Sequence, residues 1–432
     1  MSYYIDKQSD IMDKIGIVIG AVYLFFMYLG SSVFLPSIIN RFTLLVFLGY
    51  GAVNILVKII RGKCFLYLYS LWYALFIGFC IISVSYSEYP GEIRSNHMYQ
   101  MVVCLVISTL LMDMLKTEKD FCLICWAFAI SSFVMLLFLF ATGKMVGDAN
   151  ERLGNDVSGN ANAFASFMMY STMLCTWLLL FQNYRLATKG FLFLGILGNY
   201  YALMLSGGRK YFLMPILFLL FLLISKSRKE KFSNVLQYII ITGLIAFVGY
   251  LLIIRVPLLY NAIGVRMQGL FNAITGKGVA DSSTIIRSQM RKAAINHWIN
   301  KPMLGYGFDT FKYLRTPELL NGGAHGYSHC NYTELLYNGG IVAFLLYYSI
   351  FAVIFFKART KKESNVGFIA FSVATVLTQF LLDYGGVFYD DATTQVFIML
   401  AVWCLEHLSD LPRDVHIKNE QLVGYDSKYI KS

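Results

Sequence analysis

Charged residues are scarce in this chain. Asp, Glu, Lys and Arg make up 14% of its 432 residues, whereas soluble domains contain roughly 25%. Histidine is scarcer still, with six residues, while hydrophobic residues reach 57%. This composition excludes an ordinary soluble protein, because uncharged runs of about 20 residues can cross the hydrocarbon core of a bilayer as helices.

Twelve apolar runs are candidates for membrane helices. They are residues 15–35, 42–57, 65–85, 97–112, 121–141, 162–181, 190–205, 211–224, 235–254, 335–356, 366–382 and 392–405. The sequence therefore predicts an all-α polytopic membrane protein with about 12 transmembrane helices and one long extracytoplasmic loop between helices 9 and 10. The predicted divisions are a cytoplasmic N-terminus (1–14), helices 1–9 (15–254), the loop (255–333), helices 10–12 (334–408) and a cytoplasmic tail (409–432).

Lys and Arg are distributed unevenly between the two sides of this arrangement. With the N-terminus inside, the inner segments hold 21 of the 36, the five short outer loops hold 6 and the long loop holds 9. Cytoplasmic loops normally carry the excess, and long loops are largely exempt from the rule. We therefore expect both termini in the cytoplasm and the long loop outside. Because the net charge of +11 is mostly membrane anchoring, no nucleic-acid partner is predicted.

Signals for several other classes of protein are missing. Seven of the eight cysteines lie in or beside apolar runs, and Cys330 is the exception, so no disulfide framework is predicted. A charged segment leads directly into the first full-length span, so we expect no cleavable signal peptide. No internal repeat relates the two halves of the chain, which argues against a twelve-helix transporter but leaves it as an alternative.

Two histidines, an Asn and a Glu gather where the long loop meets the tenth predicted helix. They are His325, His329, Asn331 and Glu334, and Gly340 opens the apolar run that follows. Because an imidazole titrates near neutral pH, His329 is the predicted general base. Glu334 either orients the imidazole or caps the start of the helix. His325 is a second candidate base or part of a flexible, glycine-rich loop.

Several arginines lie on the predicted outer side. Arg209 ends a very tight turn, and Arg266, Arg287 and Arg291 lie in the long loop. Guanidinium groups bind phosphate oxygens in a bidentate manner. We therefore expect them to hold a diphosphate and to stabilise it as a leaving group without a metal. Contact between each arginine and lipid headgroups is the alternative.

Acidic residues form one competing site. Asp383, Asp390 and Asp391 are predicted to face outward between helices 11 and 12, and no histidine accompanies them in the sequence. Such a group can in principle bind a divalent cation. We instead expect Asp383 to contact sugar hydroxyls, together with His325 and Asn331, and we predict neither a metal nor another cofactor.

Residues 281–299 of the long loop have the spacing of a helix. Asp281 or Ser282 is the candidate N-cap, and Lys301-Pro302 follows the end. The apolar positions are Ile286, Met290, Ala293, Ala294 and Trp298. This pattern predicts a helix in the membrane interface with Trp298 at the depth of the headgroups.

The motifs of residues 287–350 resemble the signature region of the bacterial O-antigen polymerase and ligase superfamily. Arg287 stands fifteen residues before Pro302 in an Arg…Pro-Met-Leu-Gly-Tyr-Gly pattern. His329 stands eleven residues before Gly340 in a His-x-Asn-Tyr-x-Glu-Leu-Leu…Gly-Ile pattern. Two shorter segments, Asn160-Ala-Asn162 and Ser206-Gly-Gly-Arg209, also resemble motifs of the family.

The resemblance implies a substrate class and a location. Members act on undecaprenyl-diphosphate-linked glycans at the outer face of the bacterial cytoplasmic (inner) membrane, so this glycan and the lipid bilayer are the expected partners. A flippase and a chain-length regulator are further candidates. The Asn-Tyr-x-Glu-Leu-Leu run is closer to O-antigen or capsule repeat-unit polymerases, and Cys330 and Ala343 depart from residues common in the family, the latter in ligases. A ligase and a non-catalytic subunit remain alternatives.

These features together predict glycosyl transfer by a polysaccharide polymerase. Arg209 and Arg287 hold the diphosphate of the donor, with Arg266 and Arg291 on the same side. His329 takes the proton from a hydroxyl group of the acceptor sugar. The hydroxyl oxygen attacks the anomeric carbon, and undecaprenyl diphosphate leaves with inversion.

Overall fold

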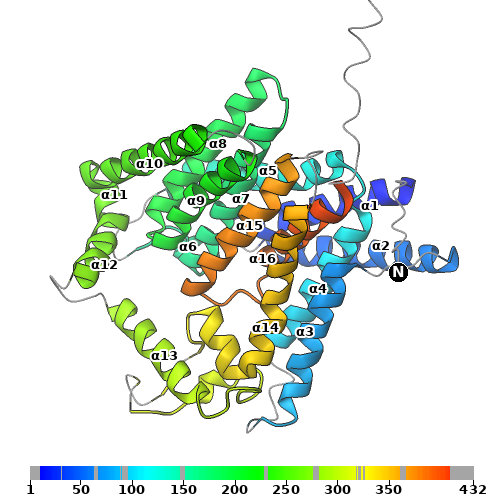
Figure 1. The fold of residues 1–432 in the computed structure, drawn as a ribbon. Coiled ribbons are helices and arrows are strands. Elements are labelled where there is room, and N and C mark those ends of the chain that lie inside the picture. Colours follow the sequence, from blue (N-terminus) through cyan, green and yellow to red (C-terminus); the bar gives the residue numbers. More distant parts are fainter. Residues whose placement is uncertain are drawn as a thin grey trace, which may run out of the picture.

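The computed structural model describes residues 10–30, 32–62, 67–87, 89, 96–145, 151–227, 232–275, 282–317, 319, 323–324, 326–360 and 366–408 (Figure 1). The regular structure in these ranges is helical, with one isolated antiparallel bridge between Arg315 and Gly323. The prediction of an all-α chain is confirmed.

Twelve helices coincide with the twelve predicted apolar runs. They are α1 (Ile11–Leu29), α2 (Ser37–Ile60), α3 (Leu68–Val84), α4 (Asn96–Met114), α5 (Glu118–Ala141), α7 (Ala161–Phe181), α8 (Leu186–Leu205), α9 (Arg209–Lys226), α10 (Phe232–Arg255), α14 (Asn331–Thr360), α15 (Val366–Leu382) and α16 (Ala392–Trp403). Among the described helices, eight are long and apolar enough to cross a membrane: α1, α2, α4, α5, α7, α10, α14 and α15. The chain is therefore a helical membrane protein.

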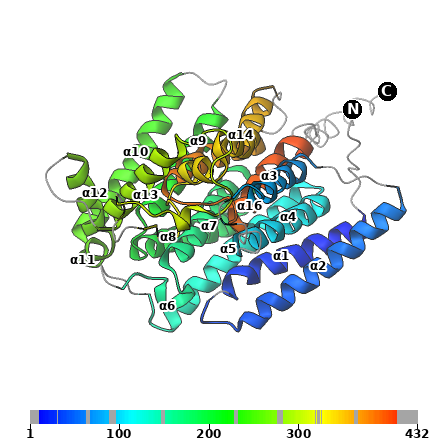
Figure 2. The same ribbon diagram turned by 90° about the horizontal axis from the view of Figure 1, so that it is seen from below.

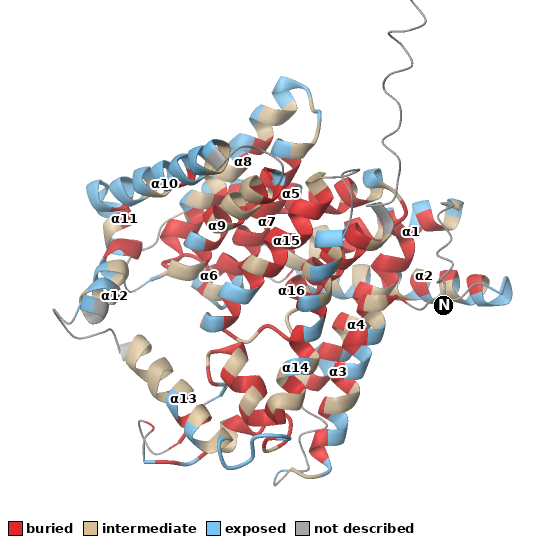
Figure 3. Ribbon diagram, viewed as in Figure 1, coloured by how far each residue is buried: buried red, intermediate tan, exposed pale blue. Residues whose placement is uncertain are grey.

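The burial of the helices shows which of them form the centre of the bundle. In the most apolar stretch of α7, 83% of the residues are buried, against 22% in α2 and 17% in α10. Figure 3 shows the same contrast between α7 and α10, and Figure 2 shows α1 and α2 side by side at one edge of the molecule. Most of the exposed residues of α10, such as Leu244 and Phe247, are apolar. A helix that is apolar on its exposed face is suited to contact with lipid.

The long loop contains more helix than its sequence predicts. The predicted helix is present as α13 (Ser282–Trp298), and Asp281 lies outside the described residues. The unpredicted elements are α11 (Pro257–Leu259), η2 (Tyr260–Gly264), α12 (Val265–Thr275) and η3 (Phe311–Tyr313). The short remaining elements are α6 (Asn155–Ser158), η5 (Asp383–Gly385) and η6 (Cys404–Leu408).

The apolar face of α13 packs on protein. Met290, Ala293 and Ala294 are buried in a small second core with Phe311 and Tyr337, and other members of this core come from the same loop. Burial of these side chains against α14 and the loop supplies the hydrophobic free energy that we had expected from the lipid interface. The position of Trp298 at the headgroups stays a prediction.

A helix break divides α14. Gly340 has φ 64° and ψ −163°, values outside the helical region. The predicted Pro-Met-Leu-Gly-Tyr-Gly motif, residues 302–307, enters this break: Ile341 N donates to Pro302 O (2.9 Å) and Gly307 N donates to Asn338 O (2.8 Å). These bonds satisfy backbone groups that the break takes out of the helical ladder.

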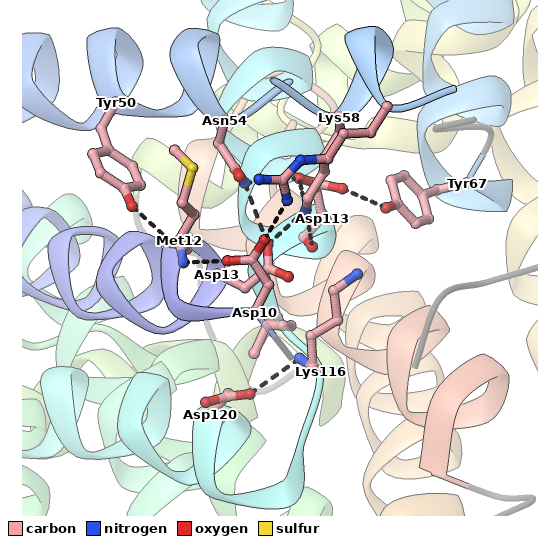
Figure 4. Close-up of polar contacts among 12 residues, drawn as sticks. Asp10, Met12, Asp13, Tyr50, Asn54, Lys58, Tyr67, Asp113, Lys116 and Asp120 are labelled. Carbon is pink, nitrogen blue, oxygen red and sulfur yellow. Dashed lines mark hydrogen bonds and ion pairs between the residues drawn. The ribbon is translucent and has the colours of Figure 1, made fainter. Parts of the chain in front are cut away.

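A buried charge network joins α1, α2 and α4 (Figure 4). Lys58 Nζ donates to Asp13 Oδ1 (2.6 Å) and Asp113 Oδ2 (2.7 Å). Asn54 donates to both carboxylates, and Tyr67 Oη donates to Asp113 Oδ1 (2.7 Å). Because removal of one partner from a buried ion pair costs about 3–5 kcal/mol, the network holds the three helices in one register.

Candidate active site

His329 adopts a left-handed backbone conformation on the turn before α14. Its φ is 58°, and such a conformation in a residue other than glycine costs about 1–3 kcal/mol. Side chains on the same turn stabilise it: Ser328 Oγ donates to Cys330 O (3.0 Å), and Thr333 Oγ1 donates to the same carbonyl (3.2 Å). Cys330 O also accepts the first helical bond, from Glu334 N. The direction of the imidazole is thus set by the start of α14.

Glu334 binds the backbone of this turn. Its Oε2 accepts from Ser328 N (2.7 Å), its Oε1 accepts from Asn338 Nδ2 (3.0 Å), and the residue is buried. Of the two roles expected for Glu334, capping is the one that these contacts form. The carboxylate binds the residue that precedes His329 and so helps to fix the turn that carries it.

The surroundings of His329 keep its imidazole neutral. Burial, together with the positive charges of Arg287, Lys210 and Arg291, lowers its pKa from the ordinary value near 6.5 to about 4. The ring of Tyr327 lies 4.4 Å from the imidazole, measured between ring centroids, and burial raises the pKa of this phenol. A neutral imidazole can accept a proton, so the environment is compatible with the predicted base.

The turn formed by residues 206–210 lies between two arginines from other parts of the chain. Arg152 Nε donates to Ser206 O (2.6 Å). A Cβ placed on Gly207, whose φ is +64°, would lie 3.5 Å from Arg152 Nε and 3.5 Å from Arg266 Cδ. Both guanidinium side chains therefore flank the backbone of this turn, and glycine leaves the space between them open.

Two further arginines join the group. Arg209 donates to Arg266 O (2.7 Å) and to Thr284 Oγ1 (3.2 Å) of α13. Arg287 follows Thr284 by three residues in α13, so the two side chains share one face of that helix. The predicted residues Arg209, Arg266 and Arg287 are thus brought together, although they are far apart in the sequence.

Arg152 is a site residue that the sequence reading missed. Its second hydrogen bond runs from Nη2 to Asn162 Oδ1 (2.9 Å). Burial lowers its pKa to about 10, and the charges of Arg266, Arg287 and Arg209 act in the same direction. The available signal was its place eight residues before Asn160, at the entry to α7. A concentration of positive charge of this kind is favoured when an anion binds.

Asn331 and Asp383 form a buried network behind His329. Asp383 accepts from Tyr348 Oη (2.7 Å), Asn331 Nδ2 (3.1 Å) and Gln379 Nε2 (2.6 Å). Asn331 and Asp383 are both 0% exposed. Residues 383–391 follow this carboxylate between α15 and α16. Both residues were expected to contact glycan, and the contacts that they form here position this segment against the start of α14.

Cationic residues also bind residues 383–391. The Arg291 guanidinium lies over the Tyr384 ring, 4.7 Å from its centroid. Lys210 Nζ donates to Gly385 O (2.8 Å). The segment thus brings α9, α13, α14 and α15 to one place.

The remaining acidic residues have structural partners. Asp390 Oδ2 lies 2.5 Å from His97 Nδ1, so the expectation that no histidine accompanies the acidic residues is wrong. Asp391 accepts from Thr394 N (2.7 Å) and caps α16. Within the described ranges, no group of three His, Cys, Asp or Glu residues has the arrangement of a metal site. His325 lies outside the described residues.

The chain is a helical membrane protein, and a cluster of arginines lies near His329. Residues 191–348 match the family model of the O-antigen ligase. The matched segment runs from α8 into α14 and contains Arg209, Arg287 and His329. This match supports the resemblance to the O-antigen polymerase and ligase superfamily that the motifs indicate. A comparison with curated proteins finds no match.

Proposed function

We propose that this protein polymerises undecaprenyl-diphosphate-linked oligosaccharide repeat units into O-antigen or capsular polysaccharide at the outer face of the bacterial inner membrane. The observation that carries the proposal is the meeting of four arginines and a neutral His329 at one end of the bundle. In the proposed orientation, all twelve helices span the membrane, both termini are cytoplasmic and this end faces outward. The imbalance of Lys and Arg supports that orientation.

The proposed reaction is a single displacement. An oxygen of an acceptor sugar hydroxyl forms a bond to the anomeric carbon of the donor glycan, and the bond from that carbon to the diphosphate oxygen breaks. His329 takes the hydroxyl proton. The electron pair of the broken bond stays on undecaprenyl diphosphate, whose charge is stabilised by Arg209, Arg287 and their neighbours. The guanidinium groups supply the stabilisation that a metal ion supplies in other transferases.

Binding of the donor also activates the base. A bound diphosphate brings negative charge next to the same arginines that depress the pKa of His329. Since opposite charge nearby favours the protonated form, the bound donor raises this pKa and strengthens the imidazole as a base. The site therefore reaches its full basicity when the donor is present.

Reconstitution of the purified protein tests the proposal. Vesicles containing the protein and undecaprenyl-diphosphate-linked single repeats should form a ladder of longer lipid-linked glycans. Transfer of a preformed glycan onto a different lipid acceptor, without a ladder, would instead indicate a ligase. Movement of the substrate across the bilayer with unchanged glycan length would indicate a transporter and overturn the proposal.

Replacement of Arg209 or Arg287 by Lys should reduce extension by about tenfold or more. Lys keeps the charge but loses the planar pair of donors, and a hydrogen bond to a charged group contributes about 1.5–3 kcal/mol. Initial rates at saturating acceptor, with protein amounts matched, measure the effect. Lys144→Met is the control, because Lys144 lies over the ring of Phe34 and is not among the arginine contacts described above. Normal polymer from both Lys variants would exclude bidentate binding.

The acid limb of the pH profile for kcat/KM should lie well below pH 6.5. Because the pKa of His329 in the free protein is lowered to about 4, the base form persists as the pH falls and is lost only near that value. Of the three positive charges that lower the pKa of His329, that of Arg287 has the largest effect. Arg287→Gln removes it, so the acid limb should move to higher pH. Histidine-selective NMR titration, with the signal assigned by a His329 variant, checks the same shift without turnover. An unshifted titration in Arg287→Gln would contradict this electrostatic coupling.

A further inference from the structure

Lys210 directly follows Arg209 in the first turn of α9, and its ammonium group is enclosed on three sides. Nζ donates to Gly385 O (2.8 Å). It also lies over the rings of Tyr211 and Phe388, 4.6 Å and 4.7 Å from their centroids. A cation over an aromatic face is held by the electrostatic attraction of the ring.

Two glycines shape this enclosure. A Cβ on Gly386 would lie 2.7 Å from Lys210 Nζ and 2.9 Å from two atoms of the Phe388 ring, and a Cβ on Gly385 would lie 3.0 Å from Lys210 Cδ. The φ of Gly386 is −173°, an extended conformation that any residue can adopt. A side chain at position 386 would therefore displace the lysine or the ring, although the backbone conformation would accept it.

The segment that Lys210 binds leads directly to the residues behind the proposed base. Gly385 lies two residues after Asp383, which binds Asn331. Phe388 N donates to Asn331 Oδ1 (3.4 Å). Asn331 begins α14 two residues after His329, so the position of residues 383–391 and the position of the imidazole are connected through Asn331.

We infer that Lys210 is a positioning residue that couples the turn carrying Arg209 to residues 383–391 and, through Asn331, to His329. The inference rests on the proposed function for its kinetic consequence. Arg209 and Lys210 are consecutive residues at the start of α9. The first turn of this helix therefore fixes both the arginine that holds the diphosphate and the lysine that binds Gly385 O. The donor and the base are thereby kept in fixed relation during transfer.

Lys210→Met and Gly386→Ala test the coupling in the full-length protein. Methionine keeps much of the length of the Lys210 side chain and removes its ammonium group. Alanine at position 386 leaves Lys210 unchanged but places a methyl group 2.7 Å from its ammonium nitrogen. Each variant should lower kcat for extension by about tenfold, with little change in KM for the donor. The double variant should be no worse than either single one, because both changes remove the same contact. Lys144→Met, which removes a lysine 5.9 Å from the Phe34 ring, should leave kcat unchanged.

Hydrogen–deuterium exchange supplies a readout that does not depend on turnover. Backbone amides of residues 383–391 should exchange faster in Lys210→Met and in Gly386→Ala than in the wild type. Unchanged exchange and unchanged kcat would overturn the inference. A rise in donor KM with unchanged exchange would also overturn it, since it would place the ammonium on the substrate. If the wild type fails to extend glycans while exchange responds as expected, the proposed function fails and the anchoring contact stands.

Discussion

Replacement of His329 by Asn is expected to abolish chain extension while the protein remains folded and membrane-inserted. Asn adopts positive φ more readily than other residues, so it should fit the value of 58° at this position. It cannot take a proton at working pH. General-base catalysis contributes about 10²- to 10⁴-fold in rate, and a loss of that size should leave lipid-linked single repeats unextended.

The measurement is the length distribution of lipid-linked glycan in reconstituted vesicles, with thermal unfolding in detergent as the check on folding. His329→Ala is the comparison variant, because it removes the base and also places a residue that disfavours positive φ at the turn. If His329→Ala unfolds at a lower temperature than His329→Asn, the difference measures the effect of backbone strain, apart from the loss of the base. Extension by His329→Asn at the wild-type rate would exclude the imidazole as the base.

Chelation provides a second arm of the same experiment. Wild-type extension should persist in EDTA, because the proposed stabilisation of the leaving group comes from guanidinium groups. Loss of extension in EDTA with recovery in magnesium or manganese would place the chemistry at a metal site. The acidic end of residues 383–391, where Asp390 meets His97, would then be the first place to look, and the assignment of His329 would be wrong.

Gly340→Ala should have the largest effect on folding. The backbone of Gly340 (φ 64°, ψ −163°) lies in a region used almost entirely by glycine. A Cβ at this position would lie 2.2 Å from Met303 O and 2.3 Å from Met303 C. The added atom would force residues 302–307 out of the break in α14 and remove their bonds to residues 338 and 341. We expect a destabilisation of more than about 3 kcal/mol, seen as low protein yield and an early unfolding transition.

Gly78→Ala is the matched control for this prediction. Gly78 lies within α3, its φ is not positive, and a Cβ there would meet no atom within 4 Å. Alanine is a better helix former than glycine by about 1 kcal/mol, so this variant should be neutral or slightly more stable. Similar yields and unfolding temperatures for both variants would show that the break in α14 tolerates a side chain.

The sequence by itself predicted an all-α membrane protein, and each predicted apolar run overlaps a helix of the structure. Helix formation in a membrane depends on composition over about 20 consecutive residues, which is local information. The same holds for α13, whose apolar positions repeat with the period of a helix. Motif spacing also brought Arg209, Arg287 and His329 to attention before their arrangement was known.

The tertiary structure alone decided how the site is assembled. Arg152 joins Arg209 and Arg287 because the entry to α7 packs beside the turn between α8 and α9. Asp390 meets His97, nearly 300 residues away in the chain, because α4 and α16 are neighbours. Glu334 binds Ser328 N. The spacing of residues in the sequence could not show whether its carboxylate would bind the backbone at the start of the helix or the imidazole.

The break in α14 shows why the sequence predicts the helices but not the contacts between distant segments. The apolar run after Gly340 reads as an ordinary helix, and its sequence predicts where it begins and ends. The positive φ of Gly340 is stabilised by Pro302 and Met303, whose carbonyl groups accept from Ile341 N and Val342 N. Hydrogen bonds and charge interactions between distant segments depend on how helices pack, and a linear pattern of residue types carries no record of that packing.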